Sequence, residues 1–484
     1  MQKSLPRSGK VLSWNAECGM RDAGCGMRNA ECGDEGFRKA DGMIKDVFTT
    51  ADILVPEGVP MEEWSVIACD QFSSERDYWE RIREKVGGAP STLHMIIPEA
   101  YLDEIDEEKK TGEISAAMDE YLRRGVLRAA KDSFVYVERT QPDGRVRRGL
   151  VGAVDLEEYD FSGGPAAILA SEGTVLERLP ARIRIRRSAG LELPHIMVFI
   201  DDKAAAVIEP LSKRADELPL LYDFDLMEGG GHIRGMRVSG DAADAVAAAV
   251  RSLHTPEHTP GAHGIPGASE RMLMVVGDGN HSLAAAKVYW DELKQGLSDK
   301  ERENHPARLA LVEVINVYDP AISFEAIHRV IFDVDPAEMI YALNNAFAGG
   351  SGCDKQDRGE YEKQGGSECD KQGRGEYELR WITSAQSGSV RVSADCIGDM
   401  LTALQEFLDR HIKRTGCRVD YIHGADTAER LARQERRLGL ILPAMDKDEL
   451  FKTVAAGRVF PKKSFSVGHA QDKRYYLECR AIRS

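Results

Sequence analysis

The sequence has no stretch of about 18 apolar residues, the length that a helix needs to cross a bilayer. Its first residues, MQKSLPRSGKVLSW, also lack the apolar core of a signal peptide. We therefore expect a cytoplasmic protein with no membrane partner. The nine cysteines include no Cys-x-x-Cys pair, so we expect free, reduced thiols rather than a zinc or redox motif.

Basic residues are fewer than acidic ones. The chain has 64 Lys and Arg against 80 Asp and Glu, which gives a net charge of −16. Nucleic-acid-binding proteins carry a basic stripe that neutralises phosphates. The one local basic run, Arg182 to Arg187, alternates with apolar residues and predicts a strand with one polar face. We therefore expect no DNA or RNA partner, whereas a small phosphate pocket needs only a few backbone amides and cations.

Several standard catalytic signatures are absent. The sequence contains no GxxxxGK[ST] phosphate loop, no HExxH zinc motif, no GxSxG nucleophile elbow and no GxGxxG dinucleotide motif. Each of these short patterns is tied to one type of site. Their absence argues against a P-loop enzyme, a zinc protease, an esterase and a Rossmann dehydrogenase.

Two polar repeats interrupt the sequence. Residues 16–36 contain three copies of a seven-residue unit with glycine, and CDKQDRGEYE from Cys353 recurs as CDKQGRGEYE from Cys369. Segments with much glycine and charge and few apolar residues do not bury a core. We therefore expect a disordered segment at 1–49, a core at 50–340, a low-complexity insertion at 341–377 and an α/β region at 378–484.

Apolar runs and amphipathic segments alternate along the remaining sequence, which predicts a mixed α/β fold. The strands expected in the core are 95–98, 133–139, 147–155, 181–187, 194–201, 272–276 and 308–317, and its helices are 73–86, 101–130, 242–253 and 282–293. In the C-terminal region we expect strands at 378–383, 389–392, 420–423 and 438–442 and in the tail at 460–482, with helices at 399–413, 426–437 and 446–456. A capping box from Asp426 is expected to begin the second of these helices.

The strongest local signal is the loop Gly277-Asp278-Gly279-Asn280-His281-Ser282. It lies between the apolar run Met272–Val276 and an amphipathic helix, and its glycines permit a tight turn. The free amides and dipole at the start of the helix would attract an anion. Asp278 would hold a metal or a hydroxyl, and His281 would extend from the first turn. The alternative is that Asp278 or Asn280 only caps the helix.

Three weaker candidates lie elsewhere. Glu172 would act as a general base or bind a cation, unless it is an ordinary surface residue. The three glycines before His232 would allow a ligand to approach the backbone, or would simply form a hairpin. Lys463, followed by Ser464, would face a phosphate, or would only be solvated.

The sequence resembles a known family over most of residues 50–484. The resemblance is carried by WSVIACDQFSSERDYWE, APSTLHMIIPEAYL, EGTVLERLPARIRIR, ELPHIMVFIDD, VVGDGNHSLAAAK, HPARLALVEVINVYDPAISFEAIHR and FPKKSFSVGHAQDKRYYLECR. These stretches are similar to the family known as domain of unknown function 1015. Neither polar repeat belongs to the family pattern.

This resemblance implies a ParB/sulfiredoxin-like core. The family commonly has DGHHR in the loop, and relatives of that fold bind nucleotide phosphates; some are free-serine kinases or nucleotide hydrolases. Asp278, Gly279 and His281 match the motif, whereas Asn280 replaces the first His and Ser282 replaces the Arg. Glu172 and Thr174 are similar to a Glu and a Thr of the family. His232 and Lys463 lie near other landmarks of its sequences.

We therefore expect a nucleotide-dependent phosphotransferase, or a nucleotide hydrolase, that acts on a small molecule. Glu172 or His281 would serve as base, and Asp278 would bind Mg²⁺ or the acceptor. The residues expected to hold the nucleotide are Gly277, Gly279, Asn280, Ser282, His232 and Lys463. Two alternatives stay open, a ligand-sensing module without catalysis and a metal-dependent hydrolase that uses Asp278, His281 and His232. The sequence specifies neither the substrate nor the oligomeric state.

Overall fold

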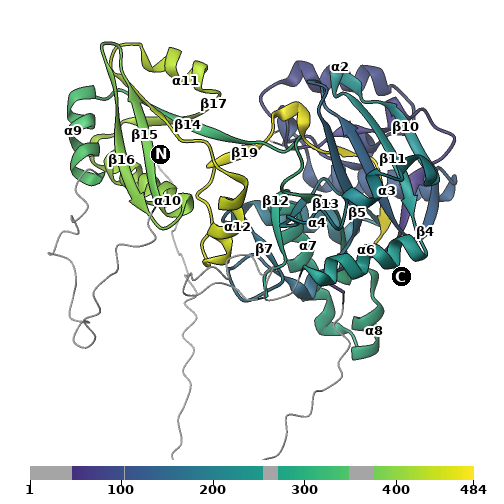
Figure 1. The fold of residues 1–484 in the computed structure, drawn as a ribbon. Coiled ribbons are helices and arrows are strands. Elements are labelled where there is room, and N and C mark those ends of the chain that lie inside the picture. Colours follow the sequence, from purple (N-terminus) through teal and green to yellow (C-terminus); the bar gives the residue numbers. More distant parts are fainter. Residues whose placement is uncertain (1–45, 103, 254–270, 348–374, 484) are drawn as a thin grey trace, which may run out of the picture. The chain divides into compact units, whose positions relative to one another are not determined.

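Strands and helices alternate along the chain in the computed structural model, which describes residues 46–102, 104–253, 271–347 and 375–483 (Figure 1). The expected mixed α/β class is thereby confirmed. The N-terminal repeats, most of the second pair of repeats and the loop expected at 254–269 lie outside the described residues. Nothing in the parts that are described is a helix long and apolar enough to cross a membrane.

The larger sheet has eleven strands. Its main path runs β10-β11-β4-β5-β13-β9-β12-β7-β6, with β1 paired to β5 and β2 paired to β4. In chain order the strands are β1 (Phe48–Thr49), β2 (Ala51–Pro56), β4 (Leu127–Thr140), β5 (Val146–Asp155), β6 (Tyr159–Asp160), β7 (Ile168–Ala170), β9 (Met197–Ile200), β10 (Leu220–Asp225), β11 (His232–Val238), β12 (Met274–Asp278) and β13 (Leu309–Asn316).

Helices cover both faces of this sheet. In β4, Val135 and Val137 join the core formed with the apolar sides of α2 and α3, whereas Phe134 and Tyr136 join the core formed with α6 and α7. This alternation follows from the two-residue period of a strand. The helices of this part are α1 (Met61–Trp64), α2 (Arg76–Val86), α3 (Glu107–Arg123), α4 (Leu179–Ser188), α5 (Glu209–Ser212), α6 (Asp241–Ser252), α7 (Asn280–Leu293) and α8 (Asp299–Asn304).

A second sheet has six strands in the order β16-β15-β18-β14-β17, with β19 paired to one end of β14. The strands are β14 (Phe324–Phe332), β15 (Gly375–Ile382), β16 (Ser387–Ala394), β17 (Arg418–His423), β18 (Arg437–Ile441) and β19 (Phe465–Val467). The helices of this part are α9 (Pro336–Phe347), α10 (Ile397–Thr415), α11 (Ala425–Ala432) and α12 (Lys447–Ala455). Apolar side chains of α9, α10 and α12 pack with those of the sheet in one core.

The C-terminal segment connects the two sheets. After β19 it forms β20 (Tyr475–Tyr476), which pairs with β3 (Val66–Ile67), and β21 (Arg480–Ala481), which pairs with β8 (Leu191–Glu192). Next to β20, Arg474 is buried and forms ion pairs with the buried carboxylates of Glu313 and Glu478. Pairing of charges offsets the cost of removing them from water, so this network fixes the segment at residue 474.

The structure corrects several predicted elements. Residues 182–187 are part of α4 and not a strand, because Leu179 and Ile183, four residues apart, place their apolar side chains on one buried helical face. The predicted helix 101–130 ends at Arg123, two residues before Gly125 with its positive φ of 66°. The predicted strand 95–98 is wrong, because Met95 ends a 3₁₀ turn, Thr92–Met95, and residues 96–98 belong to no strand.

Other predicted boundaries also differ from the structure. The helix expected from a capping box at Asp426 is α11, whose N-cap is Gly424 without a side-chain hydrogen bond. The predicted insertion at 341–377 includes the end of α9 and the start of β15, and its residues 348–374 lie outside the description. Phe48, within the segment predicted as disordered at 1–49, is buried in the core.

Candidate functional site

Two loops meet at one edge of the larger sheet. Strands β7 and β12 are parallel neighbours, with Ala170 opposite Val276. Because parallel strands end at the same edge, the loop that begins at Ser171 lies beside the loop that begins at Gly277. The Ser171 amide donates a hydrogen bond of 3.2 Å to the Val276 carbonyl, and the Asn280 side-chain nitrogen lies 3.5 Å from Ser171 Oγ. The sheet therefore brings Glu172 and the GDGNHS loop together.

The two glycines of the GDGNHS loop allow it to pass close to the neighbouring strand. A Cβ on Gly277 would lie 2.1 Å from Cε2 of Phe199, and one on Gly279 would lie 3.0 Å from Cα of Ile196. Gly279 also has a positive φ of 78°. Glycine adopts this conformation without a steric penalty. The expected tight turn is therefore present, and packing against residues 196–199 requires it.

Asp278 does not cap the helix. The N-cap of α7 is Gly279, and no side chain among the described residues caps this helix. Asp278 instead accepts a 2.8 Å hydrogen bond from the Gly279 amide and forms a 2.8 Å ion pair with Lys473. The alternative that Asp278 or Asn280 serves only as a cap is therefore not supported. The amides at the start of α7 keep their tendency to attract an anion.

Glu172 has a carboxyl group that holds its proton unusually well. Burial and the charge of Asp278 raise its pKa to about 7, against the smaller opposing effects of Lys473 and Arg329. A carboxyl with such a pKa exchanges a proton readily near neutral pH, as a general base or acid does. The loop that carries it is fixed by the Phe460 amide, which donates a 2.8 Å hydrogen bond to the Ser171 carbonyl.

His281 extends from the first turn of α7 toward the loop of Glu172. Its Nε2 accepts a hydrogen bond of 3.1 Å from the Val175 amide. Burial and the nearby charges of Arg182, Arg178 and Lys462 lower its pKa to about 4. His281 is therefore neutral at neutral pH, and its free ring nitrogen, Nδ1, carries a proton. This geometry suits a hydrogen-bond donor better than a base.

Three further side chains join this site, and sequence reasoning did not find them. Lys473 binds Asp278. Burial disfavours ionisation of Asp70, but His195, Gln71 and Lys473 together hold the pKa of its carboxyl below the usual value. His195 precedes β9, whose first residue, Met197, is opposite Asp278 in the sheet. The one signal in the sequence was position, since Asp70 follows an apolar run and His195 precedes one.

Other predicted residues lie elsewhere or bind differently. Lys463 is exposed and stacks on the Tyr421 ring, with Nζ 5.2 Å from the ring centroid, whereas its neighbour Lys462 is the lysine whose charge acts on His281. His232 binds Asp225 and Asp223 through its two ring nitrogens, at 2.7 and 2.6 Å. Its strand is separated from β12 by four others in the sheet order.

The glycines before His232 form the β10–β11 hairpin, as one of the two alternatives expected. Gly229 and Gly231 both have positive φ, and a Cβ on Gly231 would lie 2.0 Å from the Thr140 carbonyl oxygen. The structure does not bring this hairpin to the GDGNHS loop.

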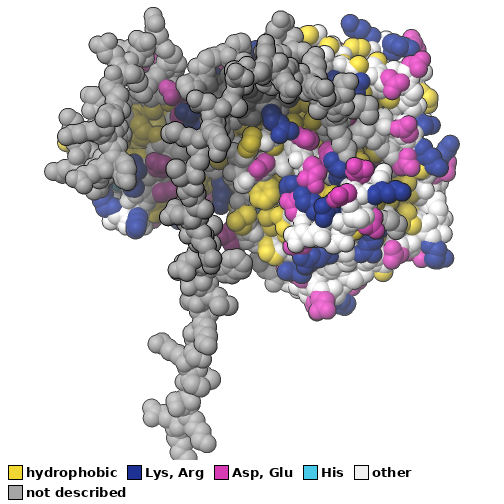
Figure 2. Space-filling view, turned by 90° about the horizontal axis from the view of Figure 1, so that it is seen from below, with side chains coloured by type: hydrophobic (Ala, Val, Ile, Leu, Met, Phe, Trp, Pro, Cys, Tyr) yellow, Lys and Arg dark blue, Asp and Glu magenta, His cyan; other side chains and the backbone are white. Residues whose placement is uncertain are grey.

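Unsatisfied polar atoms also mark the two loops. Thr174 Oγ1 and Asn280 Oδ1 are buried and have no hydrogen-bond partner among the described residues. Such atoms in a folded protein call for an explanation, such as a bound polar ligand. On the described part of the face that Figure 2 shows, basic and acidic side chains are intermixed rather than gathered by sign.

The described side chains alone do not form an evident metal site. Nowhere in the described ranges do three or more His, Cys, Asp or Glu side chains gather in a way that could hold a metal ion. Asp278, His281 and His232 do not form such a set, because their contacts are with Lys473, Val175 and the carboxylates of the β10–β11 hairpin. The proposed hydrolase that uses these three ligands therefore has no support in the geometry.

Solved structures resemble this chain only distantly. A conserved hypothetical protein from Pyrococcus furiosus matches 68% of this chain and 94% of its own length, with 11% identity and a TM-score of 0.30. A free serine kinase in complex with AMP matches 68% and 90%, with 11% identity and a TM-score of 0.31. SbnI with a C-terminal truncation, from Staphylococcus aureus, matches 66% and 82%, with 8% identity and a TM-score of 0.31. No curated protein matches the chain.

The model of one protein family matches most of the sequence. The match extends over residues 54–409, so it includes Asp70, Glu172, His195 and the GDGNHS loop, whereas Lys473 lies beyond it. It agrees with the resemblance carried by the quoted stretches up to residue 329, whereas the stretch at 460–480 lies beyond it. The chain belongs to the family described as "Protein of unknown function (DUF1015)".

Proposed function

We propose that this chain is a nucleotide-dependent phosphotransferase that acts on a small molecule. The observation that carries the proposal is Glu172, whose pKa of about 7 belongs to a carboxyl beside the start of α7. Phosphoryl transfer to a hydroxyl needs an anion site for the phosphates and a group that accepts the hydroxyl proton. Both requirements are supported at one edge of the sheet.

The phosphates would lie at the first turn of α7. Its amides and helix dipole favour an anion, and the positive charges of Lys462, Arg178 and Arg182 are close enough to lower the pKa of His281. His281 would donate a hydrogen bond from Nδ1. Asn280 Oδ1, which lacks a partner among the described residues, only accepts hydrogen bonds and would therefore bind a hydroxyl group of the ligand rather than a phosphate oxygen. In this proposal Ser282 takes the place of the family arginine, so Lys462, Arg178 and Arg182 supply the positive charge that this arginine would give.

Glu172 would act as the base. In its ionised form it would accept the proton of the acceptor hydroxyl while that oxygen bonds to the phosphorus and the bond from phosphorus to the nucleotide oxygen breaks. The nucleotide would leave with the electron pair of that bond. Lys473 would stabilise the charge that develops on the transferred group, since it is already held beside Glu172 by Asp278.

Mg²⁺ fits this site only together with a phosphorylated ligand. The carboxylate of Asp278 is the protein group that would hold it, and one carboxylate does not satisfy an octahedral ion alone. Phosphate oxygens would complete its shell, and the ion would neutralise part of the phosphate charge. The neutral His281 and the paired His232 are not needed for it.

The test is turnover of a nucleotide by the full chain. ATP or ADP with Mg²⁺ and a panel of small hydroxyl compounds would be followed by ³¹P NMR, and we expect transfer to an acceptor that depends on Glu172. Glu172→Gln should reduce the rate by at least about a hundredfold, the lower range for loss of a general base. Glu177→Gln, which changes an exposed carboxylate five residues away, should leave it unchanged.

Two outcomes would contradict the proposal. Binding of the nucleotide without turnover of either nucleotide or acceptor would favour the ligand-sensing module. A rate that is equal in Glu172→Gln and in the unaltered chain would remove Glu172 from the mechanism.

A further inference from the structure

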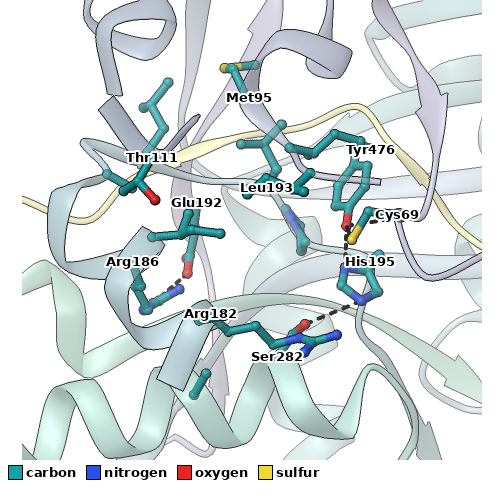
Figure 3. Close-up of a pocket in the computed structure, with 18 of the residues that line it drawn as sticks. Cys69, Met95, Thr111, Arg182, Arg186, Glu192, Leu193, His195, Ser282 and Tyr476 are labelled. Atoms are coloured by element: carbon teal, nitrogen blue, oxygen red, sulfur yellow. Dashed lines mark hydrogen bonds and ion pairs between the residues drawn. The ribbon is translucent and has the colours of Figure 1, made fainter. Parts of the chain in front are cut away.

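A cavity of about 180 Å³ lies between α3, α4 and the start of α7 (Figure 3). Most of its wall is apolar, and the side chains that form this part include Met95, Leu102, Met118, Ile185, Leu193 and Leu311. An engineered apolar cavity of about 150 Å³ takes up benzene. The volume here therefore accommodates an apolar group of about six carbon atoms.

The charged side chains in the wall are already paired. Arg182 binds Glu99 at 2.5 Å, and Arg186 binds Glu192 at 2.7 Å. Glu107 forms an ion pair with Arg184. A ligand with a net charge would have to compete with these pairs and would lose its own hydration. The wall therefore favours an electrically neutral occupant.

One end of the cavity is polar. His195, which is 7% exposed, lies between two hydroxyl groups, with Nδ1 2.9 Å from the Tyr476 hydroxyl and Nε2 3.3 Å from Ser282 Oγ (Figure 3). A hydroxyl can act as donor or acceptor by rotation. The three groups can therefore bind a hydroxyl head group of either hydrogen-bond direction. Ser282 belongs to the first turn of α7, so this end adjoins the proposed phosphate site.

We propose that the cavity binds a neutral aliphatic alcohol of about six carbons, with its chain among the apolar side chains and its hydroxyl at His195 and Ser282. That the bound alcohol is the phosphoryl acceptor rests on the proposed function; that the cavity binds it does not. In the acceptor role, the chain would hold the molecule while its hydroxyl end lies next to the start of α7.

Straight-chain 1-alkanols test the size and polarity of the cavity. Their binding to the full chain would be measured by titration calorimetry, from propanol to nonanol. Each added methylene should improve the dissociation constant about fourfold, the effect of burying one such group, until the cavity is full near hexanol. Hexanoate and hexylamine should bind at least about tenfold more weakly than hexanol, because their charges meet a wall of paired ions. Equal affinity along the series, or tighter binding of a charged analogue, would overturn the proposal.

Variants locate the binding in this cavity. Ala181→Leu places a larger side chain in the wall from α4 and should weaken hexanol binding at least about tenfold, whereas Ala116→Leu, on the exposed side of α3, should not. Leu193→Ala enlarges the cavity and should move the best chain length beyond hexanol. This gain cannot result from misfolding, so an unchanged optimum in Leu193→Ala together with unchanged binding in Ala181→Leu would place the alcohol elsewhere.

The results separate this inference from the proposed function. If hexanol binds as described but is never phosphorylated, the cavity inference stands and the phosphotransferase proposal loses its acceptor. If another compound is phosphorylated while the alkanols bind without dependence on length, the cavity inference is wrong and the phosphotransferase proposal stands.

Discussion

Lys473 binds Asp278 through an ion pair of 2.8 Å, with side chains that are 10% and 19% exposed. The pair joins the GDGNHS loop to a segment almost two hundred residues further along the chain. It also sets two opposite charges beside Glu172, where Asp278 raises the pKa and Lys473 lowers it. The pKa of Glu172 therefore depends on two residues, Asp278 and Lys473, that lie far apart in the sequence.

Replacing Glu172 should stabilise the protein at high pH. The pKa of Glu172 in the folded protein, about 7, lies above the ordinary value of 4.5. The folded protein therefore holds this proton more tightly than the unfolded chain does. The free energy of unfolding consequently falls as the pH rises from about 4.5 through 7. Glu172→Gln does not titrate, and at pH 8 it should unfold with a free energy about 2 kcal/mol larger than that of the unaltered chain. Urea unfolding between pH 4 and 8 would measure the difference. Glu177→Gln should show none, and a constant difference for Glu172→Gln would contradict the raised pKa.

Asp278 and Lys473 should move the titration of Glu172 in opposite directions. Asp278→Asn removes the negative charge that raises the pKa, so its midpoint should fall below about 7. Lys473→Gln removes a positive charge that lowers the pKa, so its midpoint should rise. Each change also leaves a partly buried partner unpaired, which costs about 1–3 kcal/mol of stability. The midpoint would be followed by NMR of carboxyl-labelled glutamate, and shifts of the same sign would disprove the arrangement.

Gly279 should tolerate alanine less well than another glycine of similar backbone conformation. Gly163 has a φ of 89°, and no atom of the described residues lies within 4 Å of the place that a Cβ would take there. Gly163→Ala should therefore cost only the conformational penalty, about 1 kcal/mol. Gly279→Ala adds the contact with Ile196, and we expect a further loss of about 1–3 kcal/mol. Thermal unfolding of the two variants would show the difference. Equal losses would mean that the loop moves away from residue 196.

Introducing the family arginine at position 282 should strengthen nucleotide binding and weaken alcohol binding in the cavity. In Ser282→Arg, the guanidinium would add a charge-assisted hydrogen bond that contributes about 1.5–3 kcal/mol to nucleotide binding. The same long side chain would enter the polar end of the cavity, where Ser282 now lies, and should weaken alcohol binding. Ser282→Gln, long but neutral, should reproduce only the second effect. Calorimetry with ADP and hexanol would test both, and unchanged nucleotide affinity in Ser282→Arg would remove position 282 from the phosphate site.

Local pattern predicted the central loop well. A buried strand, glycines that permit a turn and an amphipathic helix lie next to one another in the sequence, and the structure has them as β12, the loop and α7. Glu172 was a weaker candidate from the sequence, and the family resemblance supported it; the parallel pairing of β7 and β12 places it beside the loop. The ParB-like character of the core stays a prediction.

Pairing between distant segments was not predictable from one sequence. His195 reaches the site because β9 lies between β12 and β13, antiparallel to the first and parallel to the second, an order that no local pattern indicates. Lys473 resembles any solvated lysine in the sequence, and only the path of its segment between the two sheets brings it to Asp278. In α4, by contrast, a local pattern gave a wrong prediction, because the alternation of arginines and apolar residues indicated a strand where the structure has a helix. Its four arginines are all paired with carboxylates, and such pairs are compatible with a helix as well as a strand.

Asp70, Glu172, His195, Asp278 and Lys473 come from five separate regions of the sequence, and the site exists only when all of them have reached their places. Contacts between residues so far apart form slowly during folding, because long loops must close first. In a refolding experiment, the ability to bind ligand should therefore return in the slowest phase, after helical signal has recovered. A ligand-binding assay on this chain would count fully folded molecules and ignore partly folded ones.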